Sequence, residues 1–174
     1  MTELWDILDE NGNKTGRLHE RGRPLAKGDY SLGVNVWIVN GKGDFLITRR
    51  AAARGHKWHT TGGCVVAGDE SLAAALKETM EEIGCILDPS SAHLFGRFLL
   101  PSLWGEDTGR MFVDVWLFRQ EIDIDTLVLQ TEEICDVMWA DEKLIKQIID
   151  EGIFVNPSEW YPYLNELLEH CSLY

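Results

Sequence analysis

The sequence lacks the features of a membrane, secreted or nucleic-acid-binding protein. It has no run of about 18 apolar residues, which a transmembrane helix would need. Residues 1–10 are acidic and contain no apolar stretch, so they do not resemble a secretory signal and favour a cytoplasmic location. Positive charge is scarce, with 16 Lys and Arg against 29 Asp and Glu and a formal net charge of −13. Such a surface repels nucleic acids and anionic membranes, so neither is expected as a partner.

Cysteine ligand patterns and linkers are also lacking. The four cysteines form no C-x-x-C pair and have no nearby histidine pattern, which argues against a structural zinc site and favours reduced thiols. No internal repeat, low-complexity segment or proline-rich linker divides the chain. The length of 174 residues therefore predicts one domain, residues 1–174, with a sizeable core.

Strand and helix signals occur together along the chain and predict an α/β or α+β sandwich around a mixed sheet. Residues 1–28 are polar and turn-rich and predict a hairpin with a lead-in loop. The other predicted strands cover residues 32–39, 45–48, 93–100, 111–119 and 137–140, and the first two are joined by a turn at residues 40–43. The predicted helices cover residues 71–83, which end at Gly84, 141–151 with Asp141 as N-cap, and 158–170 within the C-terminal segment 156–174.

Residues 71–83 are the most informative segment. On a helical wheel, Leu72, Leu76, Met80 and Ile83 fall on one side, and three glutamates fall on the other. Glu78, Glu81 and Glu82 are spaced i, i+3 and i+4, so their side chains are neighbours, and a divalent cation would relieve their repulsion. Taken alone, however, three acidic residues are more typical of a solvated helix face.

The flanking residues favour a metal site instead. The chain reads Gly63-x5-Asp69-x7-Lys77-Glu78-Thr79-Met80-Glu81-Glu82-Ile83-Gly84-Cys85. This resembles the Nudix box, G-x5-E-x7-R-E-U-x-E-E-x-G-U, with matching spacing throughout residues 63–85. Four residues depart from it: Asp69 replaces Glu, Lys77 replaces Arg, and Thr79 and Cys85 replace aliphatic residues. Lysine cannot make the bidentate contact to a carboxylate that arginine makes.

The resemblance implies an α/β/α sandwich that uses Mg²⁺ or Mn²⁺ to hydrolyse a diphosphate linkage in a nucleoside diphosphate derivative. It implies Glu78 and Glu82 as metal ligands, together with the carbonyl of Gly63. Glu81 is expected as a further ligand or as the residue that orients the attacking water, and Lys77 as the residue that orients the glutamates. A downstream acid often completes the site in this family, and the candidates are Glu132, Glu133, Glu106 and Asp107.

Basic and aromatic residues near the box are candidates for substrate binding. Arg49 and Arg50 end a predicted strand and could neutralise the diphosphate, with a solvated strand end as the alternative. Arg54 and Lys57 are weaker candidates of the same kind. Trp58 and Trp104 could stack on a base, and core packing is the alternative for each. His56 and His59 are interpreted as surface or hydrogen-bonded side chains rather than as ligands.

Three points stay open at the level of the sequence. Residues 30–51 also resemble isopentenyl-diphosphate isomerase, of the same superfamily, but its catalytic Cys aligns with Gly63 and its metal-binding His positions with Ser31 and Val65. A hydrolase is therefore preferred. A second alternative is a non-catalytic Nudix domain that senses a nucleotide. The oligomeric state is undetermined, and a homodimer is one option.

Overall fold

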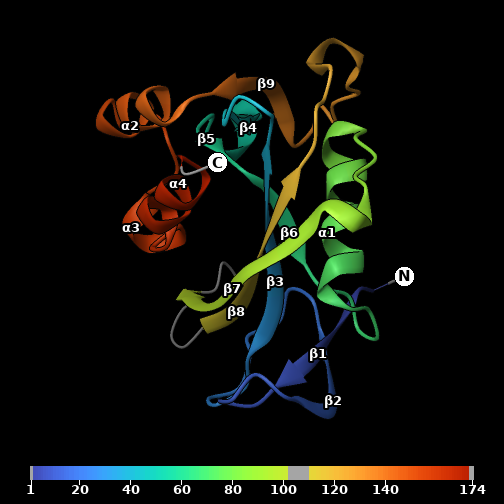
Figure 1. The fold of residues 1–174 in the computed structure, drawn as a ribbon. Helices are drawn as coiled ribbons and strands as arrows, with labels where there is room; N and C mark the ends of the chain where they lie inside the picture. The colour runs from blue at the N-terminus through green and yellow to red at the C-terminus, as the bar shows by residue number, and fades with distance from the viewer. Residues whose placement is uncertain (1, 102–109, 173–174) are drawn as a thin grey trace.

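A mixed β-sheet separates two helical layers in the computed structural model, which describes residues 2–101 and 110–172 (Figure 1). Helix α1 (Ser71–Ile83) covers one face of the sheet. Helices α2 (Glu142–Asp150), α3 (Pro157–Trp160) and α4 (Leu164–Ser172) cover the other face. The arrangement confirms the predicted α/β/α sandwich.

The sheet is built around two parallel central strands, β3 (Ser31–Val39) and β8 (Arg110–Arg119). Outside β8 lies β7 (Ala92–Pro101), and on the other side of β3 lies β4 (Phe45–Arg50), which pairs with β5 (Trp58–His59) and β9 (Ile134–Ala140). Strand β3 pairs with β4 near Ile38 and Val39, but residues 33–36 pair with β6 (Thr61–Cys64). The sheet therefore forks beside β3, and β4 and β6 diverge from that point.

Both faces of the central strands are buried, which explains why β3 reads as a nearly continuous apolar run. Val34, Val36 and Ile38 pack on the α1 side. Trp37 and Val39 pack on the side of α2 and α4. Alternate residues of each strand thus reach opposite layers, and this alternation decides which side chains can reach a site beside α1.

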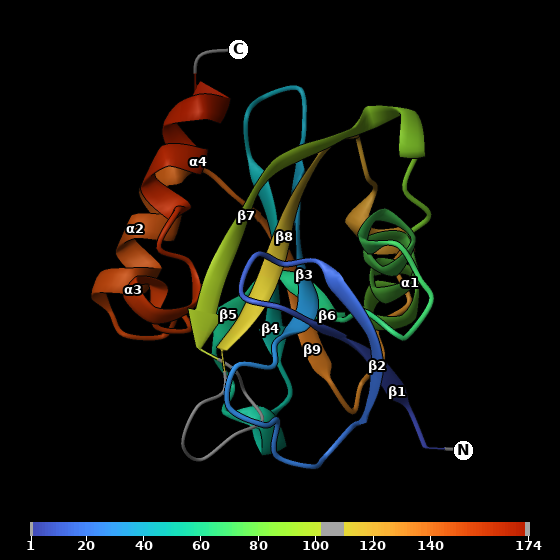
Figure 2. The ribbon, with the colours of Figure 1, turned by 90° about the horizontal axis from the view of Figure 1, so that it is seen from below.

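The predicted N-terminal hairpin is present. Strands β1 (Leu4–Leu8) and β2 (Lys14–Glu20) form an antiparallel two-stranded sheet across one end of the molecule (Figure 2). The backbones of Leu8 and Tyr30 exchange hydrogen bonds, and Lys14 Nζ donates to the Asp69 carbonyl at 3.2 Å. The hairpin therefore touches the loop that leads into α1.

The C-terminal segment corrects one prediction. A single helix over residues 158–170 is wrong, because α3 ends at Trp160 and α4 starts at Leu164. Pro162 has no N–H to donate, and it disfavours a helical backbone at Tyr161, where φ is −137° and ψ is 54°. In the part of the chain that the structure describes, no helix has both the length and the apolar character to cross a membrane.

Candidate active site

Helix α1 buries a face of small residues, and this face carries Glu82 inward. Ala75 and Thr79 are fully buried, and Glu82 is only 5% exposed, whereas Met80 is 49% exposed. The wheel grouped Met80 with the apolar residues and Glu82 with the glutamates of the other side, but the structure exposes Met80 and buries Glu82. The small side chains let the helix approach the sheet closely, and Thr79 satisfies its own hydroxyl by donating to the Ala75 carbonyl at 2.8 Å.

Strand β6 runs directly against the Glu78 carboxylate. A Cβ atom added to Gly63 would lie 2.4 Å from Cδ of Glu78 and 2.5 Å from its Oε2, far inside van der Waals contact. A Cβ on Gly62 would lie 2.2 Å from the Val34 carbonyl oxygen. Glycine is thus required at both positions, because neighbouring atoms occupy the space that a side chain would need. At Gly63 these atoms belong to the Glu78 carboxylate itself.

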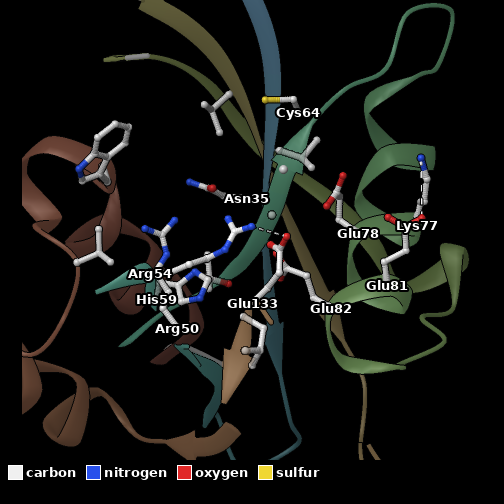
Figure 3. Close-up of a pocket in the computed structure, with 18 of the residues that line it drawn as sticks. Asn35, Arg50, Arg54, His59, Cys64, Lys77, Glu78, Glu81, Glu82 and Glu133 are labelled. Carbon is white, nitrogen blue, oxygen red and sulfur yellow. Dashed lines mark hydrogen bonds and ion pairs between the residues drawn. The ribbon is translucent and has the colours of Figure 1, made fainter. Parts of the chain in front are cut away.

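A cavity of about 330 Å³ opens at the fork of the sheet. Figure 3 shows Glu78, Glu81 and Lys77 projecting from α1 on one side, with Arg50, Arg54 and His59 on the other. The deeper lining is partly apolar and includes Leu100, Met111, Val113, Val155 and Trp160. The cavity therefore combines a wall of acids, a wall of bases and an apolar portion.

Two carboxyl groups in this cavity are held in an unfavourable environment. Burial, followed by the nearby charges of Glu78 and Glu133, raises the pKa of Glu82 to about 8. Burial, followed by the charge of Glu81, raises the pKa of Glu78 to about 7. Oε2 of Glu82 is buried and has no hydrogen-bond partner. Such an orphaned acceptor is rare in folded proteins and indicates a missing partner.

The donor set fits a small, hard divalent cation. Mg²⁺ typically takes one or two carboxylates and completes its octahedron with water and phosphate oxygens. Glu78 and Glu82 offer such a pair, and a cation would satisfy Oε2 of Glu82 and reverse the mutual repulsion. In residues 2–101 and 110–172, no three His, Cys, Asp or Glu side chains already converge into a complete metal site. Water or substrate would have to supply the remaining ligands.

The alternation of β4 separates the two arginines that the sequence grouped together. Arg50 lines the cavity. Arg49 points to the opposite face, where its guanidinium carbon lies 5.6 Å from the ring centre of Trp58 and its Nε donates to the His56 carbonyl. Trp58 is 6% exposed and belongs to the core on the α2 side. Neither Arg49 nor Trp58 is among the residues that line the cavity.

Glu133 reaches the cavity and Glu132 does not. Arg54 Nη2 donates to Oε1 of Glu133 at 2.7 Å, and both residues line the cavity. The Gln130 backbone N–H donates to the Glu82 carbonyl at 2.8 Å, which ties this segment to the end of α1. Glu132 is exposed. The remaining candidates Glu106, Asp107 and Trp104 lie outside the described residues.

His59 is a feature that the sequence interpretation missed. Its ring is 7% exposed, lines the cavity, and leaves Nε2 buried without a hydrogen-bond partner. Burial and the charge of Arg50 lower its pKa to about 3, so the ring is neutral at physiological pH. The signal was weak in the sequence because it depends on the pairing of β5 with β4, a contact between separate strands.

Comparison with known proteins decides the family. The model of the NUDIX domain matches residues 29–158, most of the chain. This chain is a member of the Nudix family. An uncharacterised Nudix hydrolase from Listeria innocua is 32% identical over 171 residues, which cover 96% of this chain and 94% of that protein. The Nudix chain described here is accordingly a hydrolase.

Solved structures show the same fold. A Deinococcus radiodurans protein superposes with a TM-score of 0.69 at 21% identity and covers 97% of this chain and 99% of that one. A bifunctional NMN adenylyltransferase/ADP-ribose pyrophosphatase from Francisella tularensis, complexed with AMP and a manganese ion, has a TM-score of 0.61 at 20% identity. It covers 82% of this chain and 42% of that one. Nudix hydrolases in general use divalent metal ions.

The departures from the Nudix box have distinct structural settings. Cys85 and Thr79 are buried, as packing residues should be. Lys77 Nζ lies 4.0 Å from Oε1 of Glu81, and both side chains are about half exposed. Lys77 thus pairs with Glu81 rather than with Asp69, the other charged position that departs from the pattern. In this Nudix hydrolase, Lys77 therefore forms its ion pair with Glu81, the most exposed of the three glutamates, and not with the buried Glu82.

Proposed function

We propose that this Nudix hydrolase cleaves a diphosphate linkage in a nucleoside diphosphate derivative, with Mg²⁺ or Mn²⁺ held by Glu78 and Glu82. One observation carries the proposal: the buried Glu82 carboxylate, with its unpartnered Oε2, lies beside Glu78 in a cavity that also presents arginines. Without a cation this pair is destabilising, so a site of this kind is expected only where metal binding is used.

The cation, when bound, would supply Lewis-acid stabilisation of phosphoryl oxygens and lower the pKa of a bound water. The carbonyl of Gly63 is a further candidate ligand, because the Glu78 carboxylate lies close to this glycine. Glu81 is more exposed and suits a third ligand or the group that orients the attacking water. Lys77 would hold Glu81 in place through their ion pair.

The opposite wall suits the diphosphate. Arg50 and Arg54 present guanidinium groups to the cavity and can donate to phosphoryl oxygens. Glu133, held by Arg54, is the downstream acid best placed to act as an extra ligand or as the base. Because Arg49, Trp58 and Glu132 lie outside the cavity lining, we assign the substrate contacts to Arg50 and Arg54.

One structural neighbour, the bifunctional NMN adenylyltransferase/ADP-ribose pyrophosphatase, was solved with AMP, which supports a nucleotide-derived substrate. The isomerase alternative is disfavoured by the residues themselves. The isomerase Cys position is Gly63, where a side chain would collide with Glu78, and its His positions are the buried residues Ser31 and Val65. A nucleotide sensor is disfavoured because binding alone needs no destabilising carboxylate pair.

Hydrolysis of a substrate panel tests the proposal. The purified protein is incubated with ADP-ribose, dinucleoside polyphosphates, nucleotide sugars, nucleoside triphosphates and isopentenyl diphosphate, with and without Mg²⁺, and products are identified by ³¹P NMR. We expect diphosphate cleavage that requires metal and is lost in Glu82→Gln. Tight binding of a panel member without cleavage would instead support the sensor, and isomerisation of isopentenyl diphosphate would support the isomerase.

A further inference from the structure

Trp160 lines the cavity with a ring that has no aromatic or polar partner of its own. It ends α3, is partly buried, and packs against the core on the side of α2 and α4. Trp37, Trp116 and Trp139 each donate their indole N–H to an oxygen of the protein. The side chain of Trp160 forms no hydrogen bond, ion pair or ring contact among the described residues. The fold therefore leaves a large aromatic surface at the cavity wall.

Hydrogen bonds and a buried neighbour hold Trp160 at this wall. The Val155 N–H donates to the Trp58 carbonyl at 2.9 Å, which ties the segment before α3 to β5. The Trp160 N–H donates to the Asn156 carbonyl at 3.0 Å. Tyr161, the next residue, is buried in the core. The backbone of Trp160 is thus held on both sides, and no rearrangement of α3 is needed for its ring to meet a ligand.

The neighbours of Trp160 in the cavity favour a flat aromatic ligand. They are the apolar side chains Leu100, Met111, Val113 and Val155, which belong to the same core cluster or pack against it. A phosphate or a polyhydroxylated sugar would lose its water here without gaining partners, which is unfavourable. An aromatic ring loses little and gains a stacking contact with the indole. A nucleobase is such a ring, and stacking on an aromatic side chain is a common way to bind one.

We propose that the base of the substrate stacks on the ring of Trp160, in the apolar portion of the cavity. Helix α3 lies in the helical layer opposite α1 (Figure 2), so the nucleoside points away from the carboxylates and the diphosphate lies between them and the base. The proposal rests on the proposed function and adds to it the residue that binds the base and the direction of the bound nucleoside. Because every base has a π-face, Trp160 selects nucleotides over diphosphates without a ring, and both purines and pyrimidines are accepted.

Binding of two non-hydrolysable probes tests the role of Trp160. α,β-Methylene-ADP carries a diphosphate mimic on a nucleoside, and methylenebisphosphonate is the mimic alone. Calorimetry in Mg²⁺ compares wild type with Trp160→Leu, which keeps an apolar side chain, and with Trp160→Phe, which keeps an aromatic ring. We expect Trp160→Leu to weaken the binding of α,β-methylene-ADP about tenfold and to leave that of methylenebisphosphonate unchanged. Trp160→Phe should retain most of the affinity for α,β-methylene-ADP.

Trp139→Leu is the matched control, because Trp139 is also partly buried but lies outside the cavity lining. It should bind both probes as wild type does. Equal weakening of both probes by Trp160→Leu would show that Trp160 supports the site as a whole, and unchanged binding of α,β-methylene-ADP would place the base elsewhere. Either result overturns the inference, as does a Trp160→Phe variant that binds as weakly as Trp160→Leu.

The inference and the proposed function can fail separately. If the substrate panel is cleaved but wild type binds α,β-methylene-ADP no more tightly than methylenebisphosphonate, the inference fails and the proposed function stands. If no panel member is cleaved, the proposed hydrolysis fails, and the binding comparison still shows whether Trp160 binds a base. Should Trp160→Leu not fold, NMR of wild type decides: we expect NOE contacts between the adenine protons of α,β-methylene-ADP and the Trp160 indole, whose signals Trp160→Phe identifies. A bound probe without these contacts would overturn the inference.

Discussion

At the scale of single residues, Glu82 lowers the stability of the metal-free protein at neutral and alkaline pH, because its carboxylate is buried in the site. Its carboxyl group is buried beside Glu78, and its pKa is raised to about 8 from the ordinary value of 4.5. A carboxyl group with a raised pKa holds its proton in the folded state at pH values where the unfolded chain has lost it. Its contribution to stability is therefore fully present below about pH 4.5 and is lost as pH rises through about 8.

This sign predicts how Glu82→Gln behaves without metal. At about pH 4 the variant and wild type should unfold at similar temperatures in EDTA, because the wild-type carboxyl is mostly protonated in both the folded and the unfolded chain. At about pH 8.5 the variant should unfold a few degrees higher, since it has no buried charge to ionise. Thermal denaturation followed by circular dichroism measures both. Glu132→Gln, at an exposed site, is the matched control; equal unfolding temperatures at the higher pH would contradict a strained Glu82 charge.

Lys77 was expected to orient the glutamates, and its observed geometry limits that role. Its Nζ is 4.0 Å from Oε1 of Glu81 in a half-exposed pair, and such pairs contribute about 0–1 kcal/mol. Lys77→Ala should therefore lower kcat/KM by less than about fivefold. Steady-state kinetics with the best panel substrate measures it. A loss as large as that of Glu82→Gln would show that Lys77 orients the buried carboxylates after all.

At the scale of elements, local signals predicted the structure well where they were decisive. The helix over residues 71–83 has the predicted limits, and Asp141 caps α2 by accepting from the Leu144 N–H. The prediction of one continuous C-terminal helix was wrong because Pro162 disfavours a helical backbone at the residue before it. The helical wheel of α1 did not predict which face is buried. The buried face is the one whose small residues, such as Ala75 and Thr79, fit against the sheet, and apolar character alone does not identify it.

The end of α1 offers a test of how this element is fixed. Gly84 has a φ of +66°, and a Cβ there would lie 3.0 Å from the Val128 backbone nitrogen. Gly152 has a φ of +70° and open space around it. Gly152→Ala should cost about 1 kcal/mol from its backbone conformation alone. Gly84→Ala should cost more, since it also displaces residue 128; urea denaturation compares the two, and equal losses would mean that the contact is unimportant.

At the scale of the whole molecule, the site depends on contacts that no local pattern reveals. The spacing of residues 63–85 indicated the glutamates and Gly63, because one helix and one turn hold them. Arg54 was only a weak candidate and His59 was set aside, since their positions depend on the pairing of β4, β5 and β9. The same pairing turns Arg49 and Trp58 away from the cavity. The sequence thus predicted the acidic side of the cavity. The basic side, with Arg50 and Arg54, depends on how the strands pair at the fork of the sheet.

The dependence of hydrolysis on Mg²⁺ tests the central claim most directly. Initial rates with the best panel substrate are measured across a Mg²⁺ titration for wild type, Glu82→Gln and the control Glu132→Gln. We predict a saturable requirement for Mg²⁺ in wild type and in the control. In Glu82→Gln we predict that the initial rate falls by at least about a hundredfold, because removing a metal ligand should cost at least as much as removing an outer-shell partner of the metal. Hydrolysis that persists in EDTA, or that Glu82→Gln retains with an unchanged Mg²⁺ dependence, would contradict a catalytic metal held by this helix.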